Sequence, residues 1–288
     1  MSDVDAKTLA LAEHWLDVGQ PARTLEALGR VSGDELHDAE YWELRTRAHV
    51  ELEQWVEALR AVREGLELDP ESLVLLDGAA LVHAERGELA AAEEMVLRAL
   101  RLDADNPYLL CRYAQILHRG NELDKAERVL ARAAAIAPDD EAVIQTRVSH
   151  EYLRGNDRAA ERLSRELLEQ DADHPVGHAM LGGLAADRGS FRAARRHTGS
   201  AVAYDPAEYG DLARLVRRST HPLLWPLWPI QRFGPAKVWL AAILTMGILT
   251  ALDQTFLLGL FVVAYLFLVV YSWVIGPLVV KYLEWRAR

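Results

Sequence analysis

The ten histidines of this chain are the residue type best suited to ligate a metal ion or to move protons near neutral pH. His174 and His178 are four residues apart, the spacing at which two side chains share one face of a helix. Pro175 begins a helix between them, which leaves His174 in the preceding turn, and no third ligand follows at helical spacing. We therefore predict no metal site. His49 and His83 occupy corresponding positions of the sequence repeat described below, which indicates a structural role.

Other arrangements that would carry chemistry are missing from the sequence. It contains no Gly-rich phosphate loop, no serine nucleophile elbow and no kinase signature. The single cysteine, Cys111, excludes an internal disulfide and a cysteine-based zinc site. An enzyme that shares its active site with a partner would need converging titratable residues, and the sequence does not show them. We predict that the protein is not an enzyme and needs no cofactor.

The stretch Pro107–Asp140 predicts two amphipathic helices with a break at Arg119-Gly120-Asn121. Apolar residues recur at i, i+3, i+4 and i+7 in the first helix, and at a similar helical spacing in the second. They are Leu110, Tyr113, Ala114 and Leu117, followed by Leu123, Ala126, Leu130 and Ala133. A helix pair this short cannot bury its apolar face alone, so it needs similar pairs on both sides.

A shift by one period of about 34 residues brings the same pattern back throughout the stretch 1–208. One series consists of alanine throughout: Ala58, Ala92, Ala126, Ala160 and Ala194. A second series is Gly65, Ala99, Ala133, Leu167 and Ala201, in which Leu167 departs from the small residues. Gly19, Gly87, Gly155 and Gly189 mark turns within repeats, and Pro70, Pro138 and Pro206 mark turns between them. Small residues at fixed positions allow helix axes to approach to about 8–10 Å.

This periodic helix–turn–helix pattern resembles the tetratricopeptide repeat (TPR). The resemblance implies an all-α, right-handed superhelical solenoid over residues 1–208, with about six repeats. Their predicted bounds are 5–38, 39–72, 73–106, 107–140, 141–174 and 175–208. The first repeat is degenerate, with Thr24 at the alanine position. A capping helix is predicted at 207–220, since repeat arrays close with a helix that has a polar outer face.

The charge of the chain is unevenly placed, because the net charge of −11 combines −16 over residues 1–210 with +5 over residues 211–288. Phosphate contacts need clustered Lys and Arg, so the acidic repeat region argues against nucleic acid as a partner. The acidic start of the chain runs directly into a helix, and we expect no signal peptide. Abundant Ala and Arg suggest a bacterial source.

The C-terminal part predicts a membrane anchor. Residues 221–235 form a Pro- and Trp-rich linker, whose prolines exclude a regular helix over residues 223–230. The linker suits the bilayer interface, the alternative being a linker packed on the last repeat. Residues 236–252 and 255–275 are apolar and would reach about 25 and 31 Å, against a hydrocarbon core of about 30 Å. A soluble hydrophobic helix pair is the alternative, but the second segment is apolar around its whole circumference. Residues 236–288 thus predict a two-span hairpin with a basic juxtamembrane tail.

The orientation follows from the basic residues that flank the two spans. All of them lie on the repeat side, and the tip between the spans has only the acid Asp253. They are Arg217, Arg218, Arg232, Lys237, Lys281, Arg286 and Arg288. The positive-inside rule then predicts a multi-pass protein of the bacterial inner membrane with both termini in the cytoplasm. We expect Asp253 to cap the second span, the alternative being a functional carboxylate within the membrane.

The resemblance also implies a concave groove, lined by the first helix of each repeat, that binds a peptide or protein. The inward candidates are Arg47, Tyr108, Arg112, Gln115, Arg119, Gln145, Ser149 and Tyr152. The chaperone-binding subfamily clamps a terminal carboxylate with a Lys and an Asn four residues apart. Here those positions hold Glu43/Arg47, Asp77/Leu81, Cys111/Gln115 and Gln145/Ser149, so the clamp is absent.

Two guanidiniums that flank an amide, Arg112 and Arg119 around Gln115, would suit an acidic segment. The alternative is a solvated face with salt bridges inside each helix. On this basis we predict a membrane-anchored scaffold that recruits a protein partner to the lipid bilayer. The rival function is a non-catalytic assembly subunit of a larger membrane complex, for transport or envelope biogenesis, with the hairpin contacting a membrane protein partner.

Overall fold

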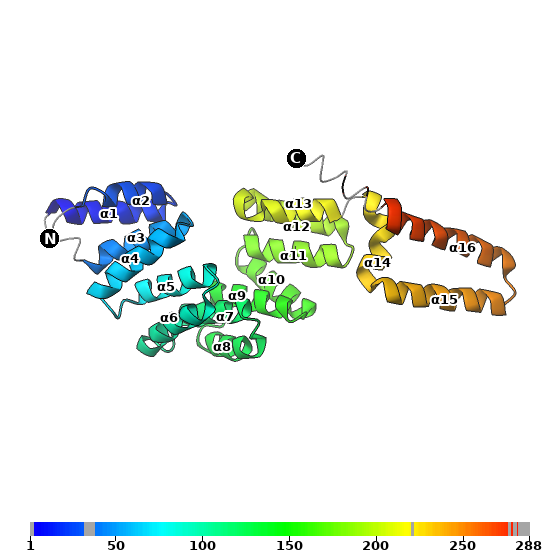
Figure 1. The fold of residues 1–288 in the computed structure, drawn as a ribbon, viewed down its shortest axis with the longest axis horizontal. Helices are drawn as coiled ribbons and strands as arrows, with labels where there is room; N and C mark the ends of the chain where they lie inside the picture. The colour runs from blue at the N-terminus through cyan, green and yellow to red at the C-terminus, as the bar shows by residue number, and fades with distance from the viewer. Residues whose placement is uncertain (1–2, 32–37, 220–221, 276–277, 279–280, 282–288) are drawn as a thin grey trace. The chain divides into compact units, whose positions relative to one another are not determined.

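The computed structural model describes residues 3–31, 38–219, 222–275, 278 and 281. The regular elements of these described residues are all helical, and the helices follow one another as antiparallel pairs joined by short turns (Figure 1). Together they form an all-helical solenoid of the expected kind over the repeat region.

The first helices of successive pairs begin at a fixed spacing, which is the period of the sequence repeat. After α1 (Asp3–Asp17) they are α3 (Ala39–Glu51), α5 (Leu73–Glu85), α7 (Pro107–Arg119), α9 (Glu141–Leu153) and α11 (Pro175–Asp187). The residue before each of these five starts is a cap whose side chain accepts a backbone N–H of the first turn: Asp38, Ser72, Asn106, Asp140 and His174. Such caps accept hydrogen bonds from backbone N–H groups that have no partner within the helix. Each cap stabilises the helix by about 1 kcal/mol. His174 is therefore a cap, in the turn where the sequence placed it.

The second helices begin at the same regular spacing. They are α2 (Pro21–Leu28), α4 (Trp55–Leu68), α6 (Leu89–Leu102), α8 (Leu123–Ile136), α10 (Asp157–Gln170) and α12 (Phe191–Tyr204). The turn before each contains one residue with positive φ, which is the left-handed conformation: Gly19, Glu53, Gly87, Asn121, Gly155 and Gly189. The next residue donates its N–H to the carbonyl five positions back, as Glu88 does to His83 at 2.8 Å. This Schellman-type turn explains the glycines of four repeats, and Glu53 and Asn121 adopt the same conformation without glycine.

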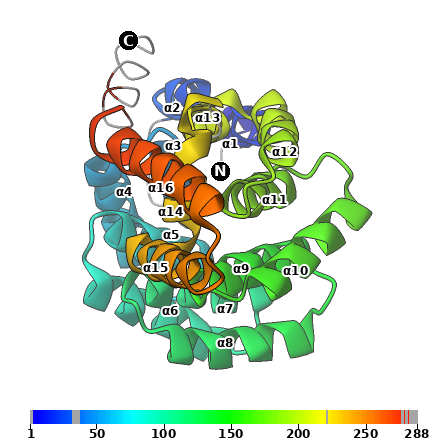
Figure 2. The same cartoon turned by 90° about the vertical axis from the view of Figure 1, so that its right-hand side faces the viewer.

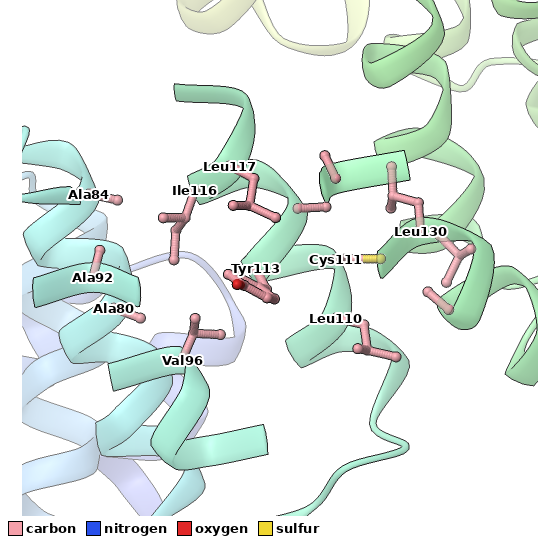
Figure 3. Packing of buried hydrophobic residues seen from close by; sticks show 14 residues of the cluster. Ala80, Ala84, Ala92, Val96, Leu110, Cys111, Tyr113, Ile116, Leu117 and Leu130 are labelled. Carbon is pink, nitrogen blue, oxygen red and sulfur yellow. The ribbon is translucent and has the colours of Figure 1, made fainter. Parts of the chain in front are cut away.

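The small-residue series lies in the core. Ala58, Ala92, Ala126, Ala160 and Ala194 are each 0% exposed. At Gly65 a Cβ atom would come within 2.8 Å of the Cβ of Trp42, so only glycine permits the approach of α4 to α3. In the central cluster, Ile116 and Tyr113 of α7 extend toward the alanines and Val96 of α5 and α6, and Cys111 lies on the opposite side of the helix (Figure 3).

The chain divides into two compact units, residues 1–156 and residues 157–288. The division falls between α9 and α10, inside the predicted repeat 141–174. The first unit contains α1 to α9, and its helices pack each on the next. In the second unit α11 packs on α12, which packs on α13 (Pro206–Ser219), and Tyr209 of α13 is buried against Ala179 and Ala201.

The Pro- and Trp-rich linker contains more helix than the sequence predicted. Residues 223–230 were not expected to form a regular helix, but the structure has a 3₁₀ helix at Pro222–Leu227 and a short α-helix, α14, at Trp228–Phe233. Pro229 lies in the first turn of α14, where a missing N–H costs no hydrogen bond. Gly234, with φ of 78°, then ends this helix. The side chains of Trp225, Trp228 and Arg232 lie outside the described residues.

The C-terminal helices form an antiparallel pair, seen in Figures 1 and 2. α15 (Pro235–Ala251) has 17 residues, and α16 (Thr255–Val270) continues into a π-helical turn at Tyr271–Ile275. Thr255–Val274 is long and apolar enough to cross a bilayer, with a mean hydropathy of 2.4 and 6% of its residues buried. Of the described helices it alone meets that criterion, because α15 is too short. The structure thus bears out one candidate span, not the predicted pair.

The tip of this pair differs from expectation in one respect. Asp253 was predicted to cap the second span, but Gln254 occupies the cap position and makes no side-chain cap hydrogen bond. Asp253 instead adopts the left-handed conformation, with φ of 55°. Two of the basic residues predicted to flank the spans, Arg286 and Arg288, lie outside the described residues, as does the side chain of Arg218.

Candidate functional site

A groove of about 470 Å³ opens on one face of the first unit. Its walls come from α1, α3, α5 and α7, which are the first helices of four successive pairs. Its apolar lining includes Leu44, Val50, Leu73, Val74, Leu81 and Leu109. Val74 is 43% exposed and Tyr108 is 52% exposed, so the floor is open to a second molecule.

The structure brings some of the predicted binding residues together and leaves others apart. Arg47, Tyr108 and Arg112 line this groove. Gln115 and Arg119 line an adjoining pocket of about 280 Å³, together with His118 and Glu85, and Arg112 reaches both. Gln145, Ser149 and Tyr152 are all on α9 and line neither of these two pockets.

The guanidinium of Arg112 is held by a carboxylate on the neighbouring first helix. Its Nε and Nη2 donate to the two oxygens of Asp77 at 2.8 and 3.2 Å, and Nη2 also donates to the Tyr108 hydroxyl at 2.8 Å. The side chains of Arg112 and Asp77 are only 13% and 15% exposed. This forked pair joins α5 to α7, and a ligand carboxylate would have to displace Asp77 to reach the same atoms.

Arg119 is engaged in the same way two turns further along α7. It forms an ion pair with Glu85 and donates to the carbonyl of Ala84 at 3.0 Å. Both arginines therefore pair across helices, with residues that lie one repeat earlier in the chain. The sequence suggested either two guanidiniums available to a ligand or salt bridges inside each helix. The structure shows neither arrangement, because both guanidiniums form salt bridges with the preceding first helix.

Acidic side chains dominate the groove, and none of them was among the cationic, aromatic and amide residues predicted from the sequence to bind a ligand. Glu13, Glu40, Glu43, Glu51 and Asp77 line the groove with two arginines. Burial raises the pKa of Glu40, and the negative charges of Asp38, Glu13 and Glu43 raise it further. Burial also raises the pKa of Glu51, an effect that Arg47 opposes and Asp17 reinforces. The spacing of Glu40, Glu43 and Glu51 from Arg47 along α3 places these four side chains on one face of the helix, which is the signal that could have identified them.

Histidines form structural contacts around this region. The Nδ1 atoms of His49 and His83 lie 2.7 and 2.6 Å from Gln54 and Glu88, so each ring fastens a first helix to the start of the next. His118 and His150 stack, with Nε2 of His118 3.0 Å from Nδ1 of His150. Burial, assisted by the charge of His150, lowers the pKa of His118 to about 4.

No group of three or more potential ligands for a metal ion occurs among the residues that the structure describes. His178 has a partner other than a metal, because its Nδ1 lies 3.0 Å from Nδ1 of His197 on α12.

Comparison with known proteins supports the repeat assignment. Residues 83–147 match the family model described as tetratricopeptide repeat. No curated protein matches the chain.

Solved structures share the fold at low sequence identity. PilW, described as a widely conserved type IV pilus biogenesis factor, has a TM-score of 0.61 at 15% identity, covering 75% of this chain and 99% of its own. A chain of the APC/C hetero-tetramer Cut9–Hcn1 has a TM-score of 0.62 at 14% identity, covering 74% of this chain and 42% of its own. PilF of Pseudomonas aeruginosa has a TM-score of 0.52 at 18% identity, covering 69% and 96%. The repeat region is therefore a TPR-like helical solenoid.

Proposed function

We propose that this protein is a non-enzymatic, membrane-anchored scaffold whose repeat groove binds a segment of a partner protein. The observation that carries the proposal is the groove itself, which is open and lined by first helices of four successive pairs. Its apolar floor would lose contact with water on binding, which contributes about 25 cal/mol for each Å² covered. The half-exposed ring of Tyr108 supplies the aromatic contact that protein interfaces favour.

The anchoring part of the proposal rests on apolar residues that no described part of the chain covers. Along α15 and α16, Trp239, Ile243, Phe256, Val263 and Phe267 are each more than half exposed. Thr255–Val274 is long enough to span alone. We propose that α15 completes a second span with local thinning of the bilayer, which costs fractions of a kcal/mol per Å of mismatch. The basic residues flanking the pair favour cytoplasmic repeats and an inner-membrane location.

Site-specific photo-crosslinking in living cells tests the groove. A photoreactive residue at Val74, in the groove, is expected to give adducts that a second change, Tyr108→Ala, removes. The matched control is Val56 on α4, which is 57% exposed but lies outside the groove. Equal adducts from both positions, or adducts from Val74 that persist in the Tyr108→Ala variant, would exclude the groove as the binding site.

The anchor and its orientation need separate measurements. The full chain is expected to stay in the membrane pellet after alkaline carbonate extraction, and the deletion of residues 221–288 is expected to release it. Protease added to spheroplasts should spare the repeats, whereas inverted vesicles should lose them. Repeats that are digested in spheroplasts would reverse the proposed orientation.

A rival proposal is an assembly subunit of a larger membrane complex. What favours it is that the small residues Ala241, Gly247 and Ala251 of α15 are exposed. Small residues let another membrane helix approach closely. Replacement of residues 222–288 by an unrelated single-span anchor distinguishes the scaffold from the assembly subunit. A scaffold is expected to keep the crosslinked adducts of its groove. An assembly subunit loses its membrane partner.

A further inference from the structure

Resting on the proposed groove function, we propose that the groove recognises a protein segment that carries Lys or Arg side chains beside apolar ones. The sequence had suggested the opposite ligand, an acidic segment. The arginines on which that prediction depended already have partners within the chain, as Asp77 engages Arg112 and Glu85 engages Arg119.

The charges that remain in the groove are mostly negative. Once Asp77 and Arg112 neutralise each other, the lining has four glutamates and Arg47. Glu13, Glu40 and Glu51 make no ion pair with any residue that the structure describes. Arg47 is 3.8 Å from Asp17 and so is itself partly compensated. A cationic side chain that binds in the groove could therefore pair with these carboxylates without displacing an existing ion pair.

Like charges in and around the groove also repel one another. Burial is the main cause of the raised pKa of Glu40, and the nearby charges of Asp38, Glu13 and Glu43 raise this pKa further. A positively charged side chain placed among them would relieve this repulsion in addition to making its own contacts. The gain is larger than at an isolated carboxylate, because several negative charges act on the same cation.

The apolar floor selects a protein segment over a free metal or a fully hydrophilic cation. No cluster of metal-ligating residues forms among the described residues, so the carboxylates are too dispersed to chelate an ion. Leu73 and Val74 line the same groove as these glutamates and suit an aliphatic neighbour of the basic side chain. The predicted ligand thus carries both basic and apolar side chains.

Fluorescence anisotropy with the full chain in a nonionic detergent tests this inference. Three labelled synthetic peptides share the same leucines and differ only in having Lys, Gln or Glu at the remaining positions. The Lys peptide is expected to bind most tightly and to weaken as salt rises from about 50 to about 300 mM, because salt screens exposed charges. Tighter binding of the Gln or Glu peptide would overturn the inference.

Variants then locate the binding. Glu13→Gln with Glu40→Gln is expected to weaken the Lys peptide about tenfold, from the loss of two exposed ion pairs. Glu57→Gln with Glu64→Gln removes the same charge from the exposed face of α4 and is expected to leave affinity unchanged, which also controls for binding to the micelle. Equal effects from the two double variants would overturn the inference.

The outcomes separate this inference from the proposed groove function. If the Gln or Glu peptide binds more tightly and Tyr108→Ala abolishes that binding, the groove binds protein segments but not cationic ones. If none of the three peptides binds, the charge inference fails, and the crosslinks from Val74 decide the groove function by themselves.

Discussion

Removal of the Arg112 guanidinium tests whether the Arg112–Asp77 pair holds α5 and α7 together. Arg112→Gln leaves the Asp77 carboxylate, which is 15% exposed, without the two hydrogen bonds at 2.8 and 3.2 Å. Breaking a buried pair from one side costs about 3–5 kcal/mol. Because both side chains keep some contact with water, we take the lower end, about 3 kcal/mol.

Amide hydrogen exchange of the full chain in detergent, read by mass spectrometry, measures this cost locally. At about 1.4 kcal/mol for each factor of ten, the amides of α5 and α7 should exchange about a hundredfold faster. Those of α12, in the other compact unit, should not change. The added change Asp77→Asn removes the unpaired charge, so the double variant should recover more than about 1 kcal/mol.

Arg119→Gln serves as the control, because its pair with Glu85 is more exposed, at 43% and 29%. It should cost less than about 1 kcal/mol. If Arg112→Gln and Arg119→Gln accelerate exchange equally, or if the double variant is no more stable than Arg112→Gln alone, the reasoning from burial is refuted.

Three further predictions address packing, backbone strain and pH. Ala126→Leu should destabilise by about 1–3 kcal/mol through overpacking, whereas Ala131→Leu on the exposed side of the same helix should change the urea midpoint little. Glu53→Gly should stabilise by about 0.5–1 kcal/mol, seen as a higher melting temperature, because φ of 55° disfavours a side chain. His118 has its pKa lowered from 6.5 to about 4, so its contribution is present above pH 6.5 and is lost as the pH falls toward 4. After allowance for its partial exposure, that loss is about 1–2 kcal/mol, and melting of His118→Gln should lack this part of the pH dependence.

Ala131 is a better matched control for Ala126 than the neighbouring residue Lys125. The Lys125 ammonium is paired with Glu93 and lies 5.2 Å from the ring centre of Tyr113, so its replacement would remove real contacts. Ala131 has no such partner and changes only the volume at an exposed site.

The repeats were predictable because close packing between helices leaves a periodic record in the sequence. An alanine that is 0% exposed recurs at the same position from the second repeat to the sixth, and one left-handed residue recurs in the turn of every repeat. The two turns without glycine, at Glu53 and Asn121, are recognisable only once the period is known. In the linker, the prolines were interpreted as helix breakers, although Pro229 in the first turn of α14 is compatible with a helix.

The groove was harder to predict because its charges pair between repeats. Arg112 and Arg119 are on one face of α7, as their spacing indicated, and this made them a plausible ligand clamp. Their partners Asp77 and Glu85 lie about one repeat earlier, and residues separated by one period face each other on adjacent first helices. Comparison of charges at that offset would have assigned both arginines to the scaffold and left the glutamates as the open charges.

The turn at Asp253 has a consequence for how the C-terminal pair would enter a bilayer. Gln254 donates its N–H to Leu249 at 3.0 Å and Asp253 donates to Thr250 at 3.1 Å, the same bonding as in the turns between paired helices of the repeats. Backbone groups without partners are very costly in hydrocarbon. A hairpin whose apex already closes these bonds presents mainly two polar side chains to be dehydrated during translocation. If the pair inserts as a hairpin, as proposed, its turn would need no further backbone partners while it crosses the hydrocarbon.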